Sequence, residues 1–165
     1  MNAADLDPAA PPMNDLLHTL ASTPRRLTGA GVNHAGEHFV GRLDLAPLVG
    51  GHAVLMHYHA THDDGEHLHR EATLLGRLPD GRLCLWPVME ELPFVLAHPA
   101  LPGAQRGDGT LEVVYASAAR DAMANFREEI TLQLAPHGAI TYAHAWGMPG
   151  EAFAARSHCV LTPDA

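Results

Sequence analysis

The sequence predicts an all-β protein whose antiparallel up-and-down meander closes into a single barrel. Turn signals that end in glycine recur along the 165 residues and separate apolar or alternating runs. A three-residue loop ending in glycine suits a type I turn followed by a left-handed residue, which commonly connects two antiparallel strands. Several such strands in one small domain must bury one face, and closing the sheet into a barrel of about 8–10 strands also removes its exposed edges.

Four of these turns divide most of the chain into predicted strands. They are Asp63-Asp64-Gly65, Pro79-Asp80-Gly81, Pro136-His137-Gly138 and Met148-Pro149-Gly150. The strands expected around them run near 37–45, 51–61, 66–78, 82–89, 93–98, 110–117, 125–135, 139–147 and 151–161. The segment 117–125 fits a helical turn or a long loop, and the sequence does not separate these two.

The N-terminal part differs from the rest. Residues 1–12 are rich in alanine, proline and aspartate and are expected to form a flexible leader before a single barrel domain at 13–165. A short helix is predicted near 14–22, because three leucines follow the N-cap candidate Asn14 at helical spacing. Pro24 is expected to end it.

Composition excludes several classes of protein. The net charge is −9 and all ten basic residues are arginine, so a basic surface for nucleic acid or anionic lipid is not expected. No apolar run approaches the roughly 20 residues of a membrane span, and no secretory signal is evident, so a cytoplasmic location is expected. Cys84 and Cys159 form no CxxC pair and are predicted to be buried free thiols.

Strand alternation places a polar group on one face of the C-terminal hairpins. With Pro136-His137-Gly138 as a three-residue loop, Glu128 opposes Trp146; with the next loop also of three residues, Tyr142 opposes Arg156. The face predicted to point inward carries Glu128, Tyr142, His144, Trp146, Arg156 and His158. The other face, with Arg127 and Glu129, is expected to meet solvent. An inward face with so many polar groups fits either an internal hydrogen-bonded network or a ligand cavity.

The chain contains 13 histidines, and histidine is the commonest metal ligand. The hairpin around Asp63-Asp64-Gly65 is the densest in them. A three-residue loop pairs His59 with His69 and His57 with Glu71, which would gather a site for a first-row transition metal.

A two-residue loop at the same turn pairs Tyr58 with Glu71 and His59 with Arg70 instead, and the metal cluster dissolves. The other side of this hairpin carries Tyr58 and Arg70, and the next strand adds Trp86. These residues are predicted to line a cavity.

The chain resembles the calycin superfamily, which includes lipocalins and fatty-acid-binding proteins, and most of all bacterial lipocalin-like barrels. The resemblance covers roughly 36–161 and rests on a short N-terminal helix, on Leu48-Val49-Gly50-Gly51-His52 before a strand, and on Leu83-Cys84-Leu85-Trp86 after a turn. It implies a cavity for an apolar or amphipathic ligand. It also implies that a carboxylate would bind Arg156 and Tyr142, or Arg70 and Tyr58.

Cupins, small barrels that bind a metal through His-x-His and a later glutamate, are the second resemblance. It rests on His57-Tyr58-His59 and His67-Leu68-His69. The leading expectation is a soluble intracellular barrel that binds a small apolar or amphipathic ligand, with an anion as one option, without catalysis, since no catalytic motif is evident; a homodimer is left open. The alternative is a metal-dependent enzyme or metal-binding protein that uses His57, His59, His69 and Glu71.

Overall fold

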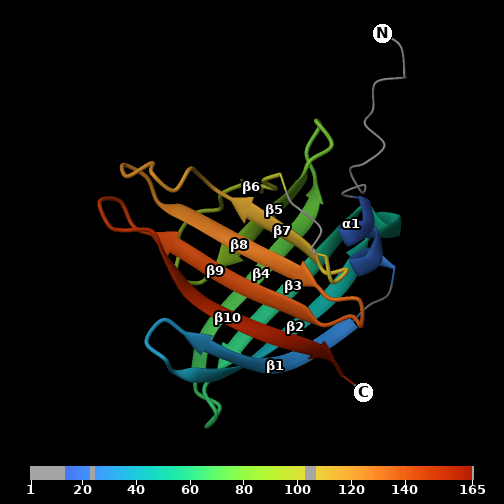
Figure 1. The fold of residues 1–165 in the computed structure, drawn as a ribbon, viewed down its shortest axis with the longest axis horizontal. Helices are drawn as coiled ribbons and strands as arrows, with labels where there is room; N and C mark the ends of the chain where they lie inside the picture. The colour runs from blue at the N-terminus through green and yellow to red at the C-terminus, as the bar shows by residue number, and fades with distance from the viewer. Residues whose placement is uncertain (1–13, 23–24, 103–106, 165) are drawn as a thin grey trace.

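A computed structural model describes residues 14–22, 25–102 and 107–164, and these form an antiparallel barrel with one short helix (Figure 1). The elements are α1 (Asn14–Ala21), β1 (Arg25–Asn33), β2 (His38–Leu48), the 3₁₀ turn η1 (Val49–Gly51), β3 (Ala53–Thr61), β4 (His67–Arg77), β5 (Leu83–Met89), β6 (His98–Pro99), β7 (Leu111–Ala116), β8 (Arg127–Leu134), β9 (Ile140–Gly147) and β10 (Ala154–Pro163). The predicted fold class is therefore confirmed. The leader at 1–12 and the helix stop at Pro24 lie outside the described residues.

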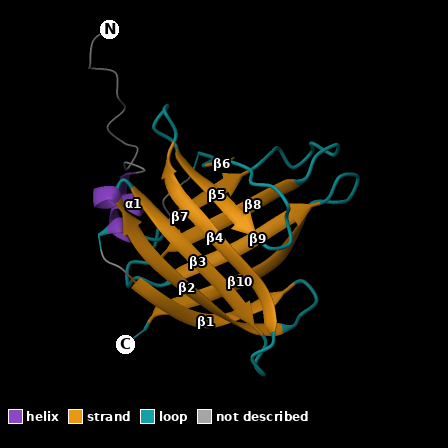
Figure 2. Cartoon of the chain, turned by 180° about the vertical axis from the view of Figure 1, so that it is seen from behind, coloured by secondary structure: helices purple, strands orange, loops and turns teal. Residues whose placement is uncertain are grey.

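The strands form one ten-stranded sheet in the order β6-β5-β4-β3-β2-β1-β10-β9-β8-β7. Every neighbouring pair is antiparallel, and neighbours in the sheet are also neighbours in the chain except β1 and β10. The consecutive strands β6 and β7 lie at the two edges. The two edge strands almost close the barrel through a single bridge between Ala100 and Tyr115. Figure 2 shows the curved sheet from the side of β2 to β4.

The strand prediction was wrong in two places. β1 was not predicted, because its sequence RRLTGAGVN contains glycines that lower strand propensity. Both glycines are needed for packing, since a Cβ on Gly29 would collide with the carbonyl oxygen of Val160 and one on Gly31 with the ring of Phe39. The strand predicted at 93–98 is instead mostly loop, and only His98–Pro99 pairs with β5. The segment 117–125 is a loop of turns.

The glycine turns have the predicted backbone geometry. Gly65, Gly81, Gly138 and Gly150 all have φ between +80° and +89°. At the first turn, the amide of His62 donates to the carbonyl of Glu66, which leaves three residues in the loop. Glycine is favoured at these positions because it reaches the left-handed region without a steric cost from Cβ.

The predicted register holds for β8 and β9 and fails for β9 and β10. Glu128 pairs with Trp146 and Leu132 pairs with Tyr142, as expected. Across the next hairpin, however, Tyr142 pairs with Cys159 rather than with Arg156. The connection is longer than three residues, and a bulge between Ala155 and Ser157 adds a further residue to β10. As a result, Cys159 faces the interior and His158 faces outward.

A bulge also decides the register of the histidine hairpin. The loop has the three residues predicted for it, but the pairing shifts between Ala60 and Thr61, where β4 has the extra residue Leu68. From there on Tyr58 pairs with Glu71 and His59 with Arg70, which is the pairing expected from the shorter loop. The three-residue loop was correct, yet the pairing of His59 with His69 derived from it was wrong.

The two ends of the barrel differ in how they are filled. At one end α1 packs its leucines Leu16, Leu17 and Leu20 into the core, where each is at most 4 % exposed. The other end carries the turns after β1, β3 and β9 and the long loops after β5 and β7 (Figure 1). No helix among the described residues is long and apolar enough to cross a membrane.

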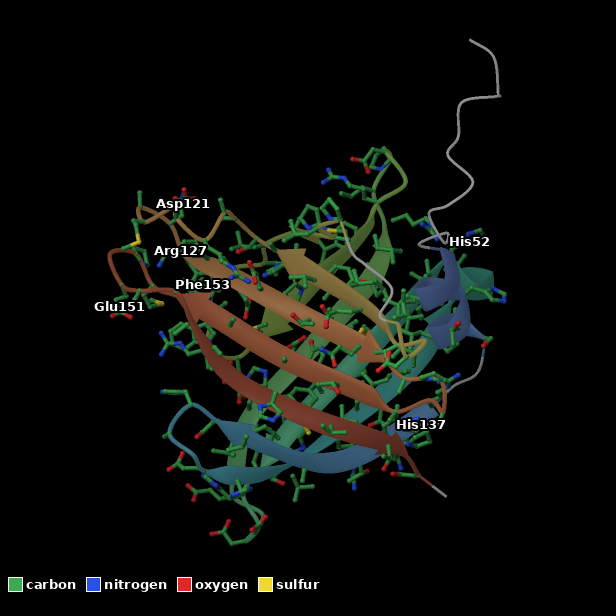
Figure 3. The ribbon with its side chains drawn as sticks, in the orientation of Figure 1. His52, Asp121, Arg127, His137, Glu151 and Phe153 are labelled. Atoms are coloured by element: carbon green, nitrogen blue, oxygen red, sulfur yellow. The ribbon has the colours of Figure 1, made fainter. Side chains whose placement is uncertain are left out.

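Arg127 lies on the outer face of β8, yet it is fully buried, which corrects the prediction that this face meets solvent there. The loops before β8 and after β9 fold over it, and Figure 3 shows Arg127 at the same end as Asp121, Glu151 and Phe153, with His52 and His137 at the opposite end. Its guanidinium donates to the carbonyls of Met148 (3.0 Å) and Glu151 (2.6 Å). Glu129, on the same face, is also buried and pairs with Arg120.

Candidate functional site

A cavity of about 360 Å³ lies inside the barrel at the end opposite α1. This volume is within the range of roughly 300–1,000 Å³ that is usual for small-molecule pockets. Fifteen residues from eight strands and three loops line it: Asn33, Phe39, Tyr58, Ala60, Leu68, His69, Met89, Glu91, Leu92, Phe126, Glu128, His144, Trp146, Met148 and Ser157. Because alternate residues of a strand face inward, each strand contributes only one or two of them.

Most of the wall is apolar. Phe39, Met89, Phe126, Trp146 and Met148 come from the ends of their strands or from the loops next to them. The side chain of Glu91 is 49 % exposed, so the cavity reaches solvent near the loop after β5. The polar groups gather deeper, where β4, β8 and β9 face one another.

Glu71 is the centre of this cluster of polar side chains, although it lies just behind the cavity wall at 1 % exposure. Its Oε1 accepts hydrogen bonds from the hydroxyls of Thr73 and, at 2.5 Å, Tyr142. Its Oε2 lies 3.4 Å from His69 Nε2. Burial by itself raises the pKa of Glu71, but hydrogen bonds from His69, Thr73 and Tyr142 outweigh it and lower the pKa. Glu71 is therefore a buried carboxylate.

His69 lies between two carboxylates. Nδ1 is 2.8 Å from Glu91 Oε1, while Nε2 faces Glu71. Burial lowers the pKa of His69, and its hydrogen bonds to Glu71 and Glu91 more than compensate and raise the pKa to about 9. At neutral pH His69 is therefore an imidazolium that donates from both nitrogens.

A second carboxylate, Glu128, lies between two histidines. Its Oε2 is 3.0 Å from His98 Nε2, and its Oε1 is 3.5 Å from His144 Nδ1. Burial raises the pKa of Glu128, and hydrogen bonds from His144 and His98 outweigh it and lower the pKa to about 2. His98 Nδ1 also faces an acceptor, the carbonyl of Leu96, at 2.9 Å.

His144 links the two carboxylates and has an unpartnered nitrogen. The residue is 8 % exposed, lines the cavity, and has no hydrogen-bond partner for Nε2. Glu71 Oε2 lies 3.6 Å from this nitrogen, which is beyond a hydrogen bond. A buried polar atom without a partner costs about 1–3 kcal/mol, and the near approach of the Glu71 carboxylate offsets part of that cost.

Tyr58 packs its ring against this cluster of polar side chains. Its ring meets that of Tyr142 edge-on, with the centroids 4.8 Å apart. It also lies over His144 in a nearly parallel orientation, at 6.4 Å. Burial raises the pKa of the Tyr58 hydroxyl, so this side chain is a neutral phenol throughout the physiological range.

The structure brings together part of the predicted ligand site. Tyr58, Glu128, His144 and Trp146 line the cavity. Tyr142 lies directly behind it, bonded to Glu71. A ligand contact for each of these residues stays a prediction.

The remaining residues predicted to contact the ligand lie elsewhere. Arg70 and His158 are exposed on the outer face. Trp86 pairs with Leu74, which is 37 % exposed, and so also faces outward. Arg156 places its guanidinium 3.9 Å from the centre of the Trp146 ring and donates to the Trp146 carbonyl, but does not line the cavity. The physical reason is the two bulges, each of which moves the following residues to the opposite face.

The predicted metal cluster is not formed. His69 and Glu71 face the interior, whereas His57 is exposed and His59 lies on the outer face, where its Nε2 is 3.0 Å from His67 Nδ1. Within residues 14–22, 25–102 and 107–164, no group of three or more histidine, cysteine, aspartate or glutamate side chains is arranged to hold a metal ion. Cys84 and Cys159 are buried free thiols, as predicted.

Sequence reasoning missed several members of the site. His98 follows a loop and was assigned no role, yet it is 1 % exposed and bonded to Glu128. Glu91 and Leu92 also come from that loop. No local pattern marks these residues, because the loop between β5 and β7 folds them inward only in the closed barrel.

The comparisons with known proteins support the fold alone. No known family matches the sequence, and no curated protein matches it. Among solved structures, the crystal structure of Rv2717c from M. tuberculosis is similar, with a TM-score of 0.71 at 15 % sequence identity. The match covers 98 % of this chain and 100 % of that one. The two chains therefore share the whole barrel, and the low identity carries no residue-level argument.

Proposed function

We propose that this barrel binds a small amphipathic molecule in its interior cavity and does not transform it. The observation that carries the proposal is the division of one cavity of about 360 Å³ into an apolar wall and a polar floor. Such pockets bind by apolar enclosure, while a few polar groups orient the ligand.

The two parts of the cavity define how the ligand lies. Its apolar body contacts Met89, Phe126, Trp146 and the other apolar side chains around the mouth. Its polar group lies against the polar lining residues His69, Glu128 and His144. Hydrogen bonds to these side chains favour amphipathic over purely apolar molecules.

An anionic ligand, expected from the resemblance to calycins, loses its support. That expectation required Arg70 or Arg156 inside the barrel, and neither is among the residues that line the cavity. In fact no arginine lines the described cavity, and the chain contains no lysine. The lining carboxylates are Glu91 and Glu128.

The first experiment uses the two tryptophans of the chain. Trp146 lines the cavity and Trp86 lies outside it, so a Trp86→Phe variant leaves a single fluorescent reporter in the proposed site. Titration with octan-1-ol is expected to change the Trp146 emission in a saturable way with one site per chain, and isothermal titration calorimetry should give the same stoichiometry. No saturable signal up to the solubility limit of the alcohol would contradict the proposal.

A blocked cavity provides the matched control. Ala60 lines the cavity and is 4 % exposed, whereas Ala143 lies on the outer face of β9 opposite His158. Ala60→Leu fills part of the cavity and is expected to weaken octanol binding about tenfold or more, which corresponds to roughly 1.4 kcal/mol. Ala143→Leu adds the same atoms outside and should leave binding unchanged. Equal binding by both variants, each shown to be folded by circular dichroism, would place the alcohol elsewhere.

A further inference from the structure

We propose that a groove on the outer face of β8, β9 and β10 binds the phosphate group of a small phosphomonoester. The groove has a volume of about 380 Å³ and extends to the turn after β1. It meets the interior cavity at the bulge of β10, where Asn33, His144 and Ser157 line both. The remaining lining residues are on the outside of the barrel, so this second site does not depend on the function proposed for the interior.

The groove follows from the alternation of residues along β9. The large side chains of this strand point inward, and the alanines between them, Ala143 and Ala145, are on the outer face. Ala143 lies between Thr131 of β8 and His158 of β10, whose longer side chains form the two banks. Figure 1 shows these strands side by side with β1 beyond them. The result is a hollow with an apolar floor and polar sides.

Arg156 is a preoriented cation in this groove. Its guanidinium lies 3.9 Å from the centre of the Trp146 ring, and its Nε donates to the Trp146 carbonyl at 3.1 Å. These two contacts fix the plane of the guanidinium. Its Nη1 and Nη2 have no acceptor in the part of the chain that the structure describes. A guanidinium held in this way binds a phosphate group through two parallel hydrogen bonds.

The opposite bank carries a second arginine and an acid that neutralise each other. Glu129 accepts from Arg120 Nε at 2.8 Å and from Nη2 at 2.7 Å, so both of its carboxylate oxygens are occupied. Glu129 is the single acidic side chain among the described residues that line the groove. Because Arg120 balances it, it opposes the binding of an anion only weakly.

Two histidines add donors beside Arg156. His34, in the turn after β1, and His158, on β10, are both exposed, and neither ring has a partner among the described residues. A neutral imidazole offers one N–H and a protonated one offers two, so each ring can donate in either state. In a chain of net charge −9, this groove therefore gathers an excess of positive charge and free donors.

The number and spread of these donors favour phosphate over carboxylate. A phosphomonoester carries a charge of about −1.5 to −2 at pH 7 and has three terminal oxygens, which can meet donors on several sides. A carboxylate has one charge and two oxygens. The methyl groups of Ala143, Ala145 and Ala155 provide a surface for an apolar ester group. A long polyanion is disfavoured because the rest of the chain is strongly acidic.

Phenyl phosphate and benzoate, which share one ring, are the probes for the first test. Each is titrated at pH 7 and constant ionic strength into Trp86→Phe, where Trp146 reports on the groove because Arg156 stacks on its ring. Phenyl phosphate is expected to bind one site per chain, by fluorescence and calorimetry, and at least about tenfold more tightly than benzoate. No saturable binding of phenyl phosphate up to about 10 mM, or equal binding of benzoate, would overturn the proposal.

Two arginines on the outer face give a matched pair of variants. Arg156 lines the groove, whereas Arg70 is exposed on β4 and does not. By calorimetry, Arg156→Gln should bind phenyl phosphate about tenfold more weakly, and Arg70→Gln, with the same loss of charge, should bind it like the wild type. Circular dichroism checks that both variants are folded. An equal effect of the two variants would show that overall charge, and not this groove, attracts the anion.

Two alanine substitutions separate the groove from the interior cavity without changing any charge. Ala143→Leu fills the groove floor and should weaken phenyl phosphate binding about tenfold while octan-1-ol binding is unchanged. Ala60→Leu fills the interior and should have the opposite effect. If Ala60→Leu weakens phenyl phosphate binding and Ala143→Leu does not, the phosphate site is wrong and the interior cavity stands. If octan-1-ol fails to bind while phenyl phosphate binds as expected, only the function proposed for the interior is overturned.

Discussion

At the scale of single residues, the interior of this barrel contains carboxylates that stay ionised although they are buried, because each has hydrogen-bond partners. Glu71 and Glu128 are at most 2 % exposed, and each accepts from at least two side chains. An unpaired carboxylate at such a depth would take up a proton instead. The lowered pKa values of both carboxylates therefore report on the histidines and hydroxyls around them.

The residue-scale prediction concerns the loss of unfolding free energy at acid pH. The hydrogen bonds to Glu128 overcome the effect of burial and lower its pKa from 4.5 to about 2. Stabilisation from a lowered carboxyl pKa is fully present above about pH 4.5 and is lost as the pH falls towards 2. Glu128→Gln should therefore lower the unfolding free energy on the order of 3 kcal/mol at pH 7 and much less at pH 2.

Urea unfolding at both pH values measures this difference, and Glu151→Gln is the control. The Glu151 side chain is exposed, and the substitution leaves intact its carbonyl, which accepts from Arg127. The control should follow the wild type at both pH values. A Glu128→Gln variant whose deficit is as large at pH 2 as at pH 7 would show that packing, and not the charge, is responsible.

At the scale of elements, the register of two hairpins decides which side chains meet. The turn glycines and the alternation of side chains predict the strands well, and the β8–β9 pairing follows from them residue by residue. A bulge is not visible in this pattern, because it inserts one residue without a turn signal. Leu68 in β4 and the shift near Arg156 in β10 are such insertions.

Helix α1 gives the prediction at this scale. Leu20 is 1 % exposed in the core at the end opposite the cavity. Leu20→Ala is expected to lower the unfolding free energy by about 2–5 kcal/mol, because the truncation leaves a space that the barrel cannot fill. Octan-1-ol affinity should be unchanged, since no residue of α1 lines the cavity.

Urea unfolding and calorimetry of the same variant test both statements, with His18→Ala as the control. His18 is exposed on the same helix, and its replacement should change stability by less than about 0.5 kcal/mol. A loss of ligand affinity in Leu20→Ala at a temperature where it is folded would show that the two ends of the barrel are coupled.

At the scale of the whole molecule, the barrel has one weakly paired seam, which runs from β5 through β6 to β7. Most neighbouring strands share six or more paired residues, but β5 and β6 share two pairs and β6 meets β7 through one bridge. Pro99 lies in β6 and has no amide to donate. The loop before β6 supplies Glu91 and Leu92, and β6 itself supplies His98, so the least paired part of the barrel forms part of the site.

Hydrogen exchange is expected to reveal this seam. Ala100 and Leu132 are equally buried, at 2 % and 1 % exposure. The Ala100 amide, which donates to Leu83 across the seam, should nevertheless exchange about 100-fold faster than that of Leu132 in the middle of β8, because local opening of β6 breaks few contacts. Exchange rates measured by NMR decide the matter, and equal protection at the two amides would contradict a local opening.

The sequence alone predicts the fold class, nine of the strands at least in part, the hairpin turns and the inward face of β8 and β9. Those features depend on local physics: glycine at left-handed positions, alternation along a strand, and leucines at helical spacing before the first strand. The same reasoning predicts inward-facing positions for Tyr58, Glu128, His144 and Trp146, and these four residues line the cavity.

Which charged side chains meet inside the barrel depends on contacts between distant parts of the chain. Two bulges moved Arg156 and His158 away from the cavity floor, placed His69 and Glu71 inside and left His57 and His59 outside. The loop after β5 then brought His98 to Glu128 across 30 residues of chain. A shift of one residue reverses the face of every side chain that follows, and no local propensity encodes it, so the chemistry of the cavity is set by the closed barrel as a whole.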